Sequence, residues 1–494
     1  MPKIDKRKSN LKQSRDSKSS TEKDCKQHGF SSHEVEKLRE SLLGWYDTNK
    51  RDLPWRRIGA QETDRNRRGY AVWVSEVMLQ QTQVATVIEY YNKWMKRWPS
   101  LQLLARASLE EVNEMWAGLG YYSRAKRLYE GCKKVVNEMN GELPRDAVSL
   151  MKTLPGVGRY TAAAIASIAF NEPVGLVDGN VVRVLSRLRI IGTDCSSTVA
   201  VEMFWKLVDE IVPKDCPGDF NQAMMELGAT VCMPKSPQCN SCPVREICLA
   251  NKRAKQLGHK KEGGIKSFFS GNLQPAECHS DALGDIEELE SDDCQLCLPK
   301  DSAWDRELGV CNYPRKAKAK EARQEKVAVC VLECHAADDN MLFLVKRPSS
   351  GLLAGLWEFP NFIVETEISN KALVTKVREF LREEFKIILP ESQKISHLGE
   401  VVHLFSHIHH TYIVHKTVLT TKPEVLSGES VNGRNAKWVQ QSKFLETAVS
   451  TGMKKVYSFH RNNGQHKKAG VKRKRDEKDG DKKQKVLDSF FVKT

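Results

Sequence analysis

The sequence Leu-Pro-Gly-Val-Gly at residues 154–158 joins two segments with helical apolar spacing, and it decides how the first half of the chain folds. Two glycines within three residues permit a tight turn that leaves backbone N–H groups pointing outward at the start of the next helix. Such N–H groups can bind a phosphate. Gly156, Val157 and Gly158 are therefore candidate phosphate contacts, although the same five residues also suit an ordinary connection between helices.

The pattern on both sides of this turn is helical from about residue 31 to residue 255. Val77, Val84, Ile88 and Tyr91 form an apolar stripe with helical spacing, which the polar residue Gln81 interrupts. This stripe predicts one helix that continues through Gln81. From residue 326 to residue 460 the pattern becomes typical of strands. These runs lie at 327–334, 341–347, 401–407 and 410–416, with a helical stretch at 371–385. The sequence predicts an all-α domain followed by a smaller α/β domain.

The charge of the chain is unevenly distributed. The 494 residues carry a formal net charge of +15, with 78 Lys and Arg against 63 Asp and Glu. Residues 1–26 hold nine basic and four acidic side chains, residues 462–494 hold eleven and five, and residues 277–305 hold one and ten. The folded parts are therefore basic, which favours a nucleic-acid partner. We expect disordered basic tails at 1–30 and 461–494 and an acidic connector at 256–325.

No stretch of the chain has the roughly 20 apolar residues of a membrane helix. The charged start MPKIDKRKSN is also unlike a secretory signal. We therefore expect a soluble intracellular protein without a membrane partner.

Four cysteines are closely spaced at the end of the helical half, in the pattern C-x6-C-x2-C-x5-C. Four thiolates at such spacing suit either a tetrahedral zinc ion or a [4Fe-4S] cluster, and the spacing alone leaves both open. These ligands are Cys232, Cys239, Cys242 and Cys248.

These cysteines, the LPGVG turn and an aspartate about twenty residues beyond it together resemble the endonuclease III/MutY DNA glycosylases. Residues 73–84, WVSEVMLQQTQV, are similar to the MutY signature. The resemblance implies a helix-hairpin-helix domain with a structural [4Fe-4S] cluster, and it implies removal of adenine mispaired with 8-oxoguanine or guanine in double-stranded DNA. GLWEFP at residues 355–360 resembles the Nudix fold and implies a Nudix-like second domain.

Cleavage of an N-glycosidic bond requires a proton for the departing base and an anion near the sugar cation. Asp178 is the expected anion, and Glu76, flanked by apolar residues that raise its pKa, is the expected acid. Family members that also nick the strand have a Lys where this chain has Tyr160, so we expect no Schiff-base lyase activity. Tyr160 and Asn180 are expected to hold Asp178 and the water. A bifunctional enzyme acting on damaged pyrimidines is the alternative.

The resemblance also implies residues that read the DNA. Gln81, next to Gln80, is expected to wedge into the base stack, and Tyr121 to stack beside it, although Tyr121 also suits a core. Gln222 is expected to read adenine in a pocket lined by Trp55, Arg56 and Leu79.

Phe405, Ser406 and His407 resemble the loop that senses 8-oxoguanine; by themselves, the five histidines at 402–415 also suit a metal site or a strand edge. The nearest approach to a Nudix catalytic helix is at 378–387. There, Arg378 and Glu379 lie one residue out of register and Lys386 replaces a glycine, so we predict no nucleotide hydrolysis.

Vertebrate MutY homologues hold a zinc ion between connector and catalytic domain. By this resemblance Cys278, Cys294 and Cys297 are candidate ligands with His28 as the fourth, or His33 in its place. Unligated loop cysteines are the simpler alternative.

The last residues contain a sequence that fits the box by which proteins bind the sliding clamp PCNA, formed by Gln484, Leu487, Phe490 and Phe491. The basic run at 472–475 suggests a nuclear location, with the mitochondrion as an alternative. We expect a monomer, with other repair or checkpoint-clamp proteins binding the connector and tails.

Overall fold

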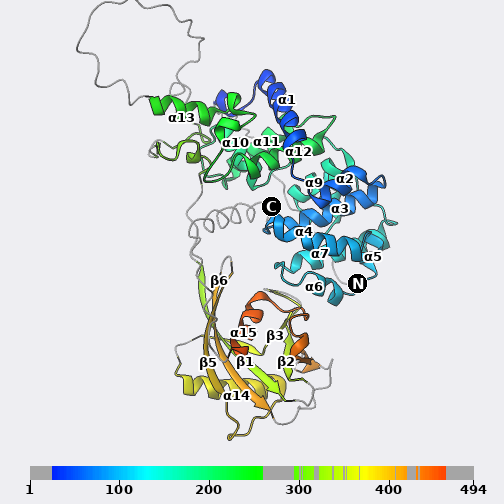
Figure 1. Cartoon of the computed structure of the whole chain (residues 1–494), viewed down its shortest axis with the longest axis vertical. Coiled ribbons are helices and arrows are strands. Elements are labelled where there is room, and N and C mark those ends of the chain that lie inside the picture. The colour runs from blue at the N-terminus through cyan, green and yellow to red at the C-terminus, as the bar shows by residue number, and fades with distance from the viewer. Residues whose placement is uncertain are drawn as a thin grey trace, which may run out of the picture.

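The computed structural model describes residues 25–259, 294–299, 302, 304–315, 322–335, 339–348, 351, 353–365, 368–405, 408–419, 430–431 and 434–462. These residues form a helical domain and a sheet domain that stack along the long axis of the molecule (Figure 1). The predictions for residues 1–24, 260–293 and 463–494 lie outside the described part. Among the described helices, none has the length and apolar character needed to cross a membrane.

The helical domain follows the predicted pattern from residue 31 onward. Its helices are α1 (Ser32–Asn49), α2 (Pro54–Gln61), α3 (Arg65–Leu79), α4 (Val84–Arg97), α5 (Leu101–Ala105), α6 (Leu109–Met115), α7 (Ser123–Glu138), α8 (Ala147–Thr153), α9 (Arg159–Phe170), α10 (Gly179–Leu188), α11 (Thr198–Ile211), α12 (Pro217–Thr230) and α13 (Leu249–His259).

The prediction of one helix running through Gln81 was wrong. Helix α3 ends at Leu79 and α4 begins at Val84, so the polar residues between them form a turn. Gln81 has a positive φ of 56° there, which a continuous helix does not permit. The apolar stripe predicted a single helix because the apolar residues of both helices pack into the same core.

Two boundaries also differ from those expected from composition. Residues 25–30, predicted to belong to the tail, include a 3₁₀ turn at Lys26–His28 whose His28 side chain is buried. The connector, predicted to begin at residue 256, begins later, since α13 continues to His259. The described connector segments 294–299 and 304–315 pack on the helical domain, where the N–H of Gly192 donates to the carbonyl of Leu296 at 2.8 Å.

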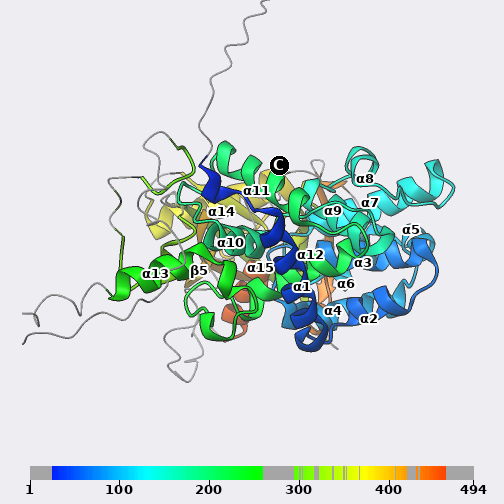
Figure 2. The same ribbon diagram turned by 90° about the horizontal axis from the view of Figure 1, so that it is seen from above.

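Helix α10 lies in the middle of the second half of this domain. It contacts α11, α12 and α13, and the view from above shows it among these helices and α1 (Figure 2). Its arginines Arg183 and Arg187, with Arg189 just beyond its end, are each 2% exposed. The first half is built around α3, which packs against α9.

The sheet domain confirms the strand runs and the helix at 371–385. Strand order is β5-β6-β1-β2-β8-β7, with β3 paired to β2 and β4 paired to β1, and β1 runs parallel to β6. The elements are β1 (Arg323–Cys334), β2 (Met341–Lys346), β3 (Trp357–Glu358), β4 (Asn361–Val364), α14 (Asn370–Phe385), β5 (Ser396–Leu404), β6 (Ile408–Leu419), β7 (Ser430–Val431), β8 (Arg434–Gln440) and α15 (Thr451–Arg461).

Strand β1 is apolar along most of its length because helices cover both faces of the sheet. Val329 and Val331 share a buried cluster with Val456 of α15, whereas Leu332 shares another with Leu381 of α14.

The end of α14 differs from a Nudix catalytic helix in the way the sequence suggests. Lys386 caps α14 with a left-handed φ of 57°, a conformation that glycine adopts without strain. Arg378 donates to the carbonyl of Pro390 at 2.7 Å, and Glu379 and Glu383 are exposed. These contacts give Arg378 a structural role, and the absence of nucleotide hydrolysis stays a prediction.

Among the described residues, the two domains meet at the carboxylate of Glu110 and at a buried apolar cluster to which both domains contribute. Glu110 of α6 accepts hydrogen bonds from the Trp357 indole at 2.8 Å and from Lys346 at 3.1 Å, and the Lys437 ammonium lies 3.8 Å from it. The Tyr122 hydroxyl donates to the carbonyl of Val449 at 3.3 Å inside a buried cluster shared by both domains.

Glu110→Ala removes the acceptor of a buried indole N–H and the partner of two ammonium groups. We expect it to destabilise the docked arrangement by about 1 to 2 kcal/mol, with a smaller effect at high salt. Thermal unfolding at low and high ionic strength measures this. Glu89→Ala, at an exposed glutamate of α4, is the matched control; equal unfolding midpoints for the two variants would contradict the role of Glu110.

Candidate active site and metal sites

Glu76 is a buried carboxylic acid on α3. Its side chain is 5% exposed, and the Tyr160 hydroxyl donates to Glu76 Oε2 at 2.6 Å. Burial raises the pKa of Glu76 to about 7, with a smaller rise from Asp178; the Tyr160 hydrogen bond and Arg56 oppose the shift. A carboxyl group with this pKa can donate a proton near neutral pH. The sequence placed Tyr160 beside Asp178, whereas the structure places its hydroxyl on Glu76.

Asp178 occupies the N-cap position of α10. Its Oδ1 accepts the N–H of Val181 at 2.7 Å, and its Oδ2 accepts the Asn180 amide at 2.8 Å, so the predicted pairing with Asn180 is confirmed. Burial is the largest influence and raises the pKa of Asp178 above its usual value, although these hydrogen bonds and Arg183 oppose the rise. A helix N-terminus also favours the ionised form.

Arg183 fixes the orientation of Asn180. It donates to Asn180 Oδ1 at 2.8 Å, which leaves the amide NH2 group to face Asp178. Arg183 also donates to the carbonyls of Gly228 at 2.6 Å and Cys232 at 2.8 Å. The sequence analysis missed this residue because only the fold shows that it is buried.

The residues expected to bind adenine lie on α2 and α12 and at the end of α3. Arg56 donates to the Gln222 side-chain oxygen at 3.2 Å and to Glu226 at 2.9 Å, while Trp55 is buried. Glu226, which the sequence analysis missed, also binds Arg51 at 2.6 Å and so fixes the position of this pair. Leu79, partly buried, packs against the same apolar core as Trp55.

The residues expected to enter the base stack lie in two strained turns. Gln81 has a φ of 56° and Tyr121 a φ of 48°, and Tyr121 is 44% exposed, so it is not a core aromatic. The Gln80 amide reaches Thr161 at the start of α9 at 3.4 Å.

The hairpin between α8 and α9 has the predicted open turn. Gly156 has a φ of 77°, and a Cβ atom there would lie 2.6 Å from Arg127. At Gly158, the N-cap of α9, nothing lies within 4 Å of an added Cβ. Buried Val157 anchors the turn, and the space beside Gly158 is open.

Cys232, Cys239, Cys242 and Cys248 line one cavity between α10 and α13. Arg187 donates to Cys232 Sγ at 3.2 Å. Among the described residues, the sulfur atoms of these four cysteines do not lie close enough to one another to hold a single ion. Their wider arrangement suits a larger cofactor.

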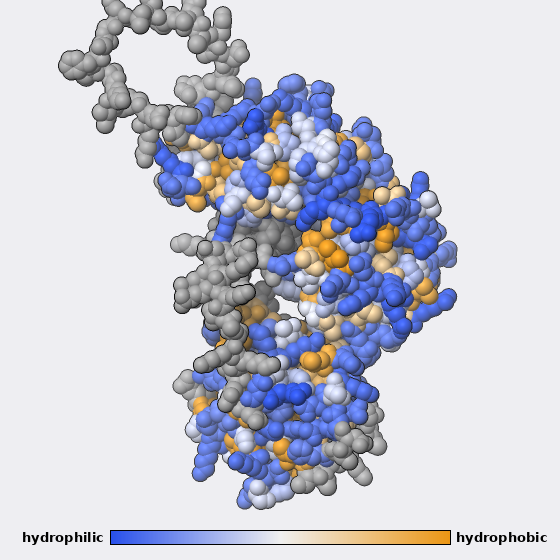
Figure 3. Space-filling model, in the orientation of Figure 1, coloured by the Kyte–Doolittle hydropathy of each residue, from blue (hydrophilic) through white to orange (hydrophobic). Residues whose placement is uncertain are grey.

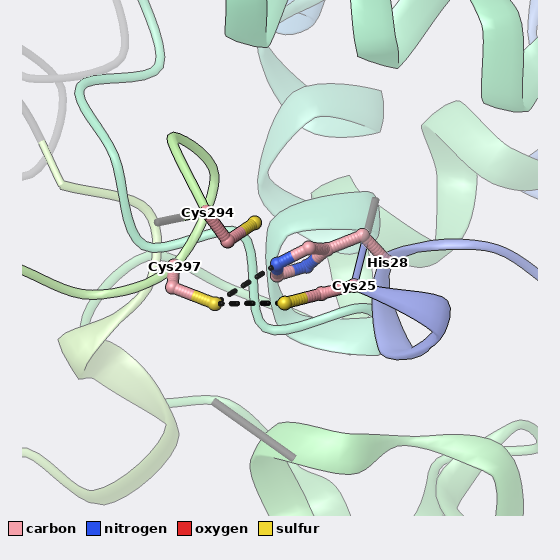
Figure 4. Close-up of side chains that lie close together, drawn as sticks. All are labelled: Cys25, His28, Cys294 and Cys297. Carbon is pink, nitrogen blue, oxygen red and sulfur yellow. Dashed lines mark hydrogen bonds between the residues drawn. The ribbon is translucent and has the colours of Figure 1, made fainter. Parts of the chain in front are cut away.

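One group does have single-ion spacing: Cys25, His28, Cys294 and Cys297, whose donor atoms all lie within 4.8 Å of one another (Figure 4). The Cys25 and Cys297 sulfurs are 3.8 Å apart, which agrees with roughly 3.8 Å for two thiolates on a tetrahedral zinc. His28 Nδ1 lies 2.9 Å from the carbonyl of Arg189, and Nε2 faces the Cys297 sulfur at 3.3 Å.

Three of the predicted zinc ligands, His28, Cys294 and Cys297, lie in this group, and Cys25 joins them. Cys25 was missed, although the spacing Cys25-x2-His28 is visible in the sequence. Cys278 lies outside the described residues, and the alternative ligand His33 is exposed on α1, away from the group.

Only part of the loop expected to sense 8-oxoguanine is described. The Phe405 ring lies edge-on to His403 and His410, with centroids 4.5 and 5.0 Å apart. Ser406 and His407 lie outside the described residues, as do the PCNA-box residues Gln484, Leu487, Phe490 and Phe491.

Two family models match the chain. Residues 74–210 match HhH-GPD superfamily base excision DNA repair proteins, and residues 328–458 match the NUDIX domain. The fold and the paired carboxyl groups thus define a helix-hairpin-helix DNA glycosylase with a Nudix-like second domain.

Similarity to curated proteins extends along most of the chain. It is 49% identical to the adenine DNA glycosylase of Homo sapiens over 465 residues, 93% of this chain and 81% of that one. It is 35% identical to the adenine DNA glycosylase of Schizosaccharomyces pombe, covering 84% of this chain and 87% of that one. A solved complex of endonuclease III with DNA covers 46% of this chain and 99% of that chain, at 26% identity and a TM-score of 0.37. The chain belongs to the adenine DNA glycosylase family, which confirms the assignment made from sequence motifs.

Adenine release should require protonated Glu76, so loss of this proton should set the fall of the pH–rate profile at high pH, its high-pH limb. We expect the single-turnover rate to fall as pH rises through about 7, and Glu76→Gln to abolish release. Tyr160→Phe removes a hydrogen bond that stabilises the carboxylate, so the pKa should rise by about one to two units and the limb move to higher pH.

Rate measurements from pH 5 to 9 test this assignment. Tyr129→Phe is the matched control, since the Tyr129 hydroxyl binds the carbonyl of Ala107 away from the site. An unmoved limb in Tyr160→Phe, or full activity in Glu76→Gln, would refute it.

Proposed function

We propose that this enzyme removes adenine paired with 8-oxoguanine or guanine in double-stranded DNA, by hydrolysis and without a lyase step. The observation that carries the proposal is a pair of carboxyl groups in unlike surroundings, since Glu76 is buried and Asp178 is partly exposed. Glu76 has a pKa near 7, whereas Asp178 accepts hydrogen bonds at a helix N-terminus.

This difference assigns the two roles. Glu76 donates a proton to the departing adenine and, once ionised, accepts a proton from the attacking water. Asp178 stabilises the positive charge that develops on the sugar. Tyr160 holds the Glu76 carboxyl group in place and, having no amine, cannot form a Schiff base. A borohydride-trapped covalent adduct would instead support the bifunctional alternative.

Recognition of 8-oxoguanine is assigned to the sheet domain through Phe405, Ser406 and His407. The support is the resemblance of this loop to the MutY recognition loop and the aromatic packing of Phe405 between two histidines.

Removing residues 326–494 should reduce the preference for A·8-oxoguanine over A·G at least tenfold. Single-turnover adenine release from the two duplexes measures this, and release from A·G controls for loss of the catalytic domain. Ser406→Ala should cause a smaller loss in the full chain. An unchanged preference in the truncated enzyme would exclude the sheet domain from base reading.

We assign a [4Fe-4S] cluster to Cys232, Cys239, Cys242 and Cys248, and a zinc ion to Cys25, His28, Cys294 and Cys297. The cavity lined by the first group and the tight spacing of the second support this division. The cluster would join the loop after α12 to α13, and the zinc ion would join the connector to residues 25–28.

Cys25→Ser and Cys294→Ser should each lower the zinc content while leaving the iron content unchanged. Cys278→Ser and the control Cys216→Ser should retain both metals, since neither belongs to the described zinc group. Elemental analysis of the purified full chain decides this. Zinc retained in Cys25→Ser, or lost in Cys278→Ser, would overturn the ligand set.

The remaining assignments rest on sequence motifs. We propose that Gln484, Leu487, Phe490 and Phe491 bind PCNA and that the basic run at 472–475 directs the enzyme to the nucleus.

A further inference from the structure

We propose that Arg124 is a positioning residue that fixes the two base-stack turns, around Gln81 and Tyr121, as one rigid wedge. The inference rests on the proposed function, in which these turns enter the DNA. Arg124 lies in the first turn of α7, and its side chain is 8% exposed.

One side of the Arg124 guanidinium holds the first turn. Its Nη1 donates to the carbonyls of Val77 at 2.7 Å, Met78 at 3.0 Å and Gln80 at 2.6 Å. These carbonyls lie where α3 ends, so they lack the intrahelical partners that carbonyls in a helix interior have. Arg124 thereby ends α3 directly before Gln81.

The other side of the guanidinium holds the second turn. Its Nη2 donates to the carbonyl of Gly120 at 3.1 Å, and it also reaches Thr82 Oγ1 at 3.3 Å in the first turn. The guanidinium carbon lies 5.4 Å from the centre of the Tyr121 ring, which attracts the cation. A single side chain therefore spans the backbone on both sides of the wedge.

This task requires an arginine. Its planar group has several donors in a fixed fork, whereas a lysine ammonium is a single point that cannot reach both turns at once. The acceptors just described are neutral oxygens, and burial lowers the pKa of Arg124 to about 9, so the group remains charged at neutral pH.

Holding these turns has a functional reason. Gln81 and Tyr121 both have positive φ, a strained conformation that persists only when surrounding contacts impose it. A wedge that entered the stack from flexible turns would lose part of its binding free energy to ordering. Arg124 supplies that order before DNA binds.

The test compares adenine release from two A·8-oxoguanine duplexes. In one the adenine is stacked between ordinary bases, and in the other tetrahydrofuran abasic analogues flank it, so no neighbouring base holds it in the stack. We expect Arg124→Lys to slow single-turnover release at least tenfold on the first and less than threefold on the second. In the matched control Arg39→Lys, which alters an arginine bonded to the carbonyls of Ile211 and Val212 away from the site, both rates should be retained.

A double-mutant cycle provides the second measurement. If Arg124 acts through the wedge, Arg124→Lys should add little to the loss caused by Gln81→Ala and Tyr121→Ala together. Equal slowing on both duplexes, additive losses, or an unchanged rate on the stacked duplex would overturn the proposal. Each rate is divided by the fraction of active enzyme, which is measured by active-site titration. Partial unfolding of a variant then leaves the ratio of its rates on the two duplexes unchanged.

Failure of the proposed function gives a different result. In that case the unaltered enzyme releases adenine from neither duplex. The wedge can still be followed by the fluorescence rise of 2-aminopurine placed at the adenine position, which reports unstacking without cleavage. A rise equally fast in Arg124→Lys and in the unaltered enzyme would then refute the role of Arg124.

Discussion

Three arginine side chains are almost fully buried in and just after α10, and the first domain is organised around their hydrogen bonds. A buried guanidinium left without acceptors would cost several kcal/mol. Arg183 and Arg187 both donate to the carbonyl of Cys232, and Arg189 donates to the carbonyls of Gly29 and Ile247. One helix and the residue after it therefore hold Asn180 beside Asp178, the loop that begins at Cys232, and the N-terminal residue Gly29. A shift of any of these segments would remove acceptors from a buried guanidinium.

The same helix explains why two carboxyl groups in one site differ. Asp178 begins α10 and accepts hydrogen bonds from the backbone of that helix and from Asn180, which Arg183 orients. Glu76 lies within α3, where the backbone N–H groups are already used, and receives one strong hydrogen bond from Tyr160. Asp178 is thus bound as a hydrogen-bond acceptor, whereas the pKa of Glu76 is about 7, and glycosidic bond cleavage requires such a difference between its two acids.

The two domains share a buried apolar cluster, so their arrangement is part of the fold. Tyr122 reaches Val449 in the sheet domain and directly follows Tyr121, which points to solvent. Most of the surface visible in Figure 3 is hydrophilic, with apolar side chains gathered in separate patches on both domains. The backbone around Tyr121 and Tyr122 therefore connects the turn proposed to enter DNA with the domain proposed to read the opposite base.

The sequence by itself determined the helical and sheet halves, the hairpin, both carboxylates and the four cysteines that line one cavity, because apolar periodicity and motif spacing are local properties. It did not determine the break at Gln81, since residues on two helices that face one core resemble a single stripe. The sequence did not predict the positioning roles of Arg124, Arg183 and Glu226, because the burial of a charged residue cannot be inferred from the sequence around it. Cys25 became a candidate metal ligand only when the fold brought it to Cys297, 272 residues away. Contacts between distant segments are what tertiary structure alone decides.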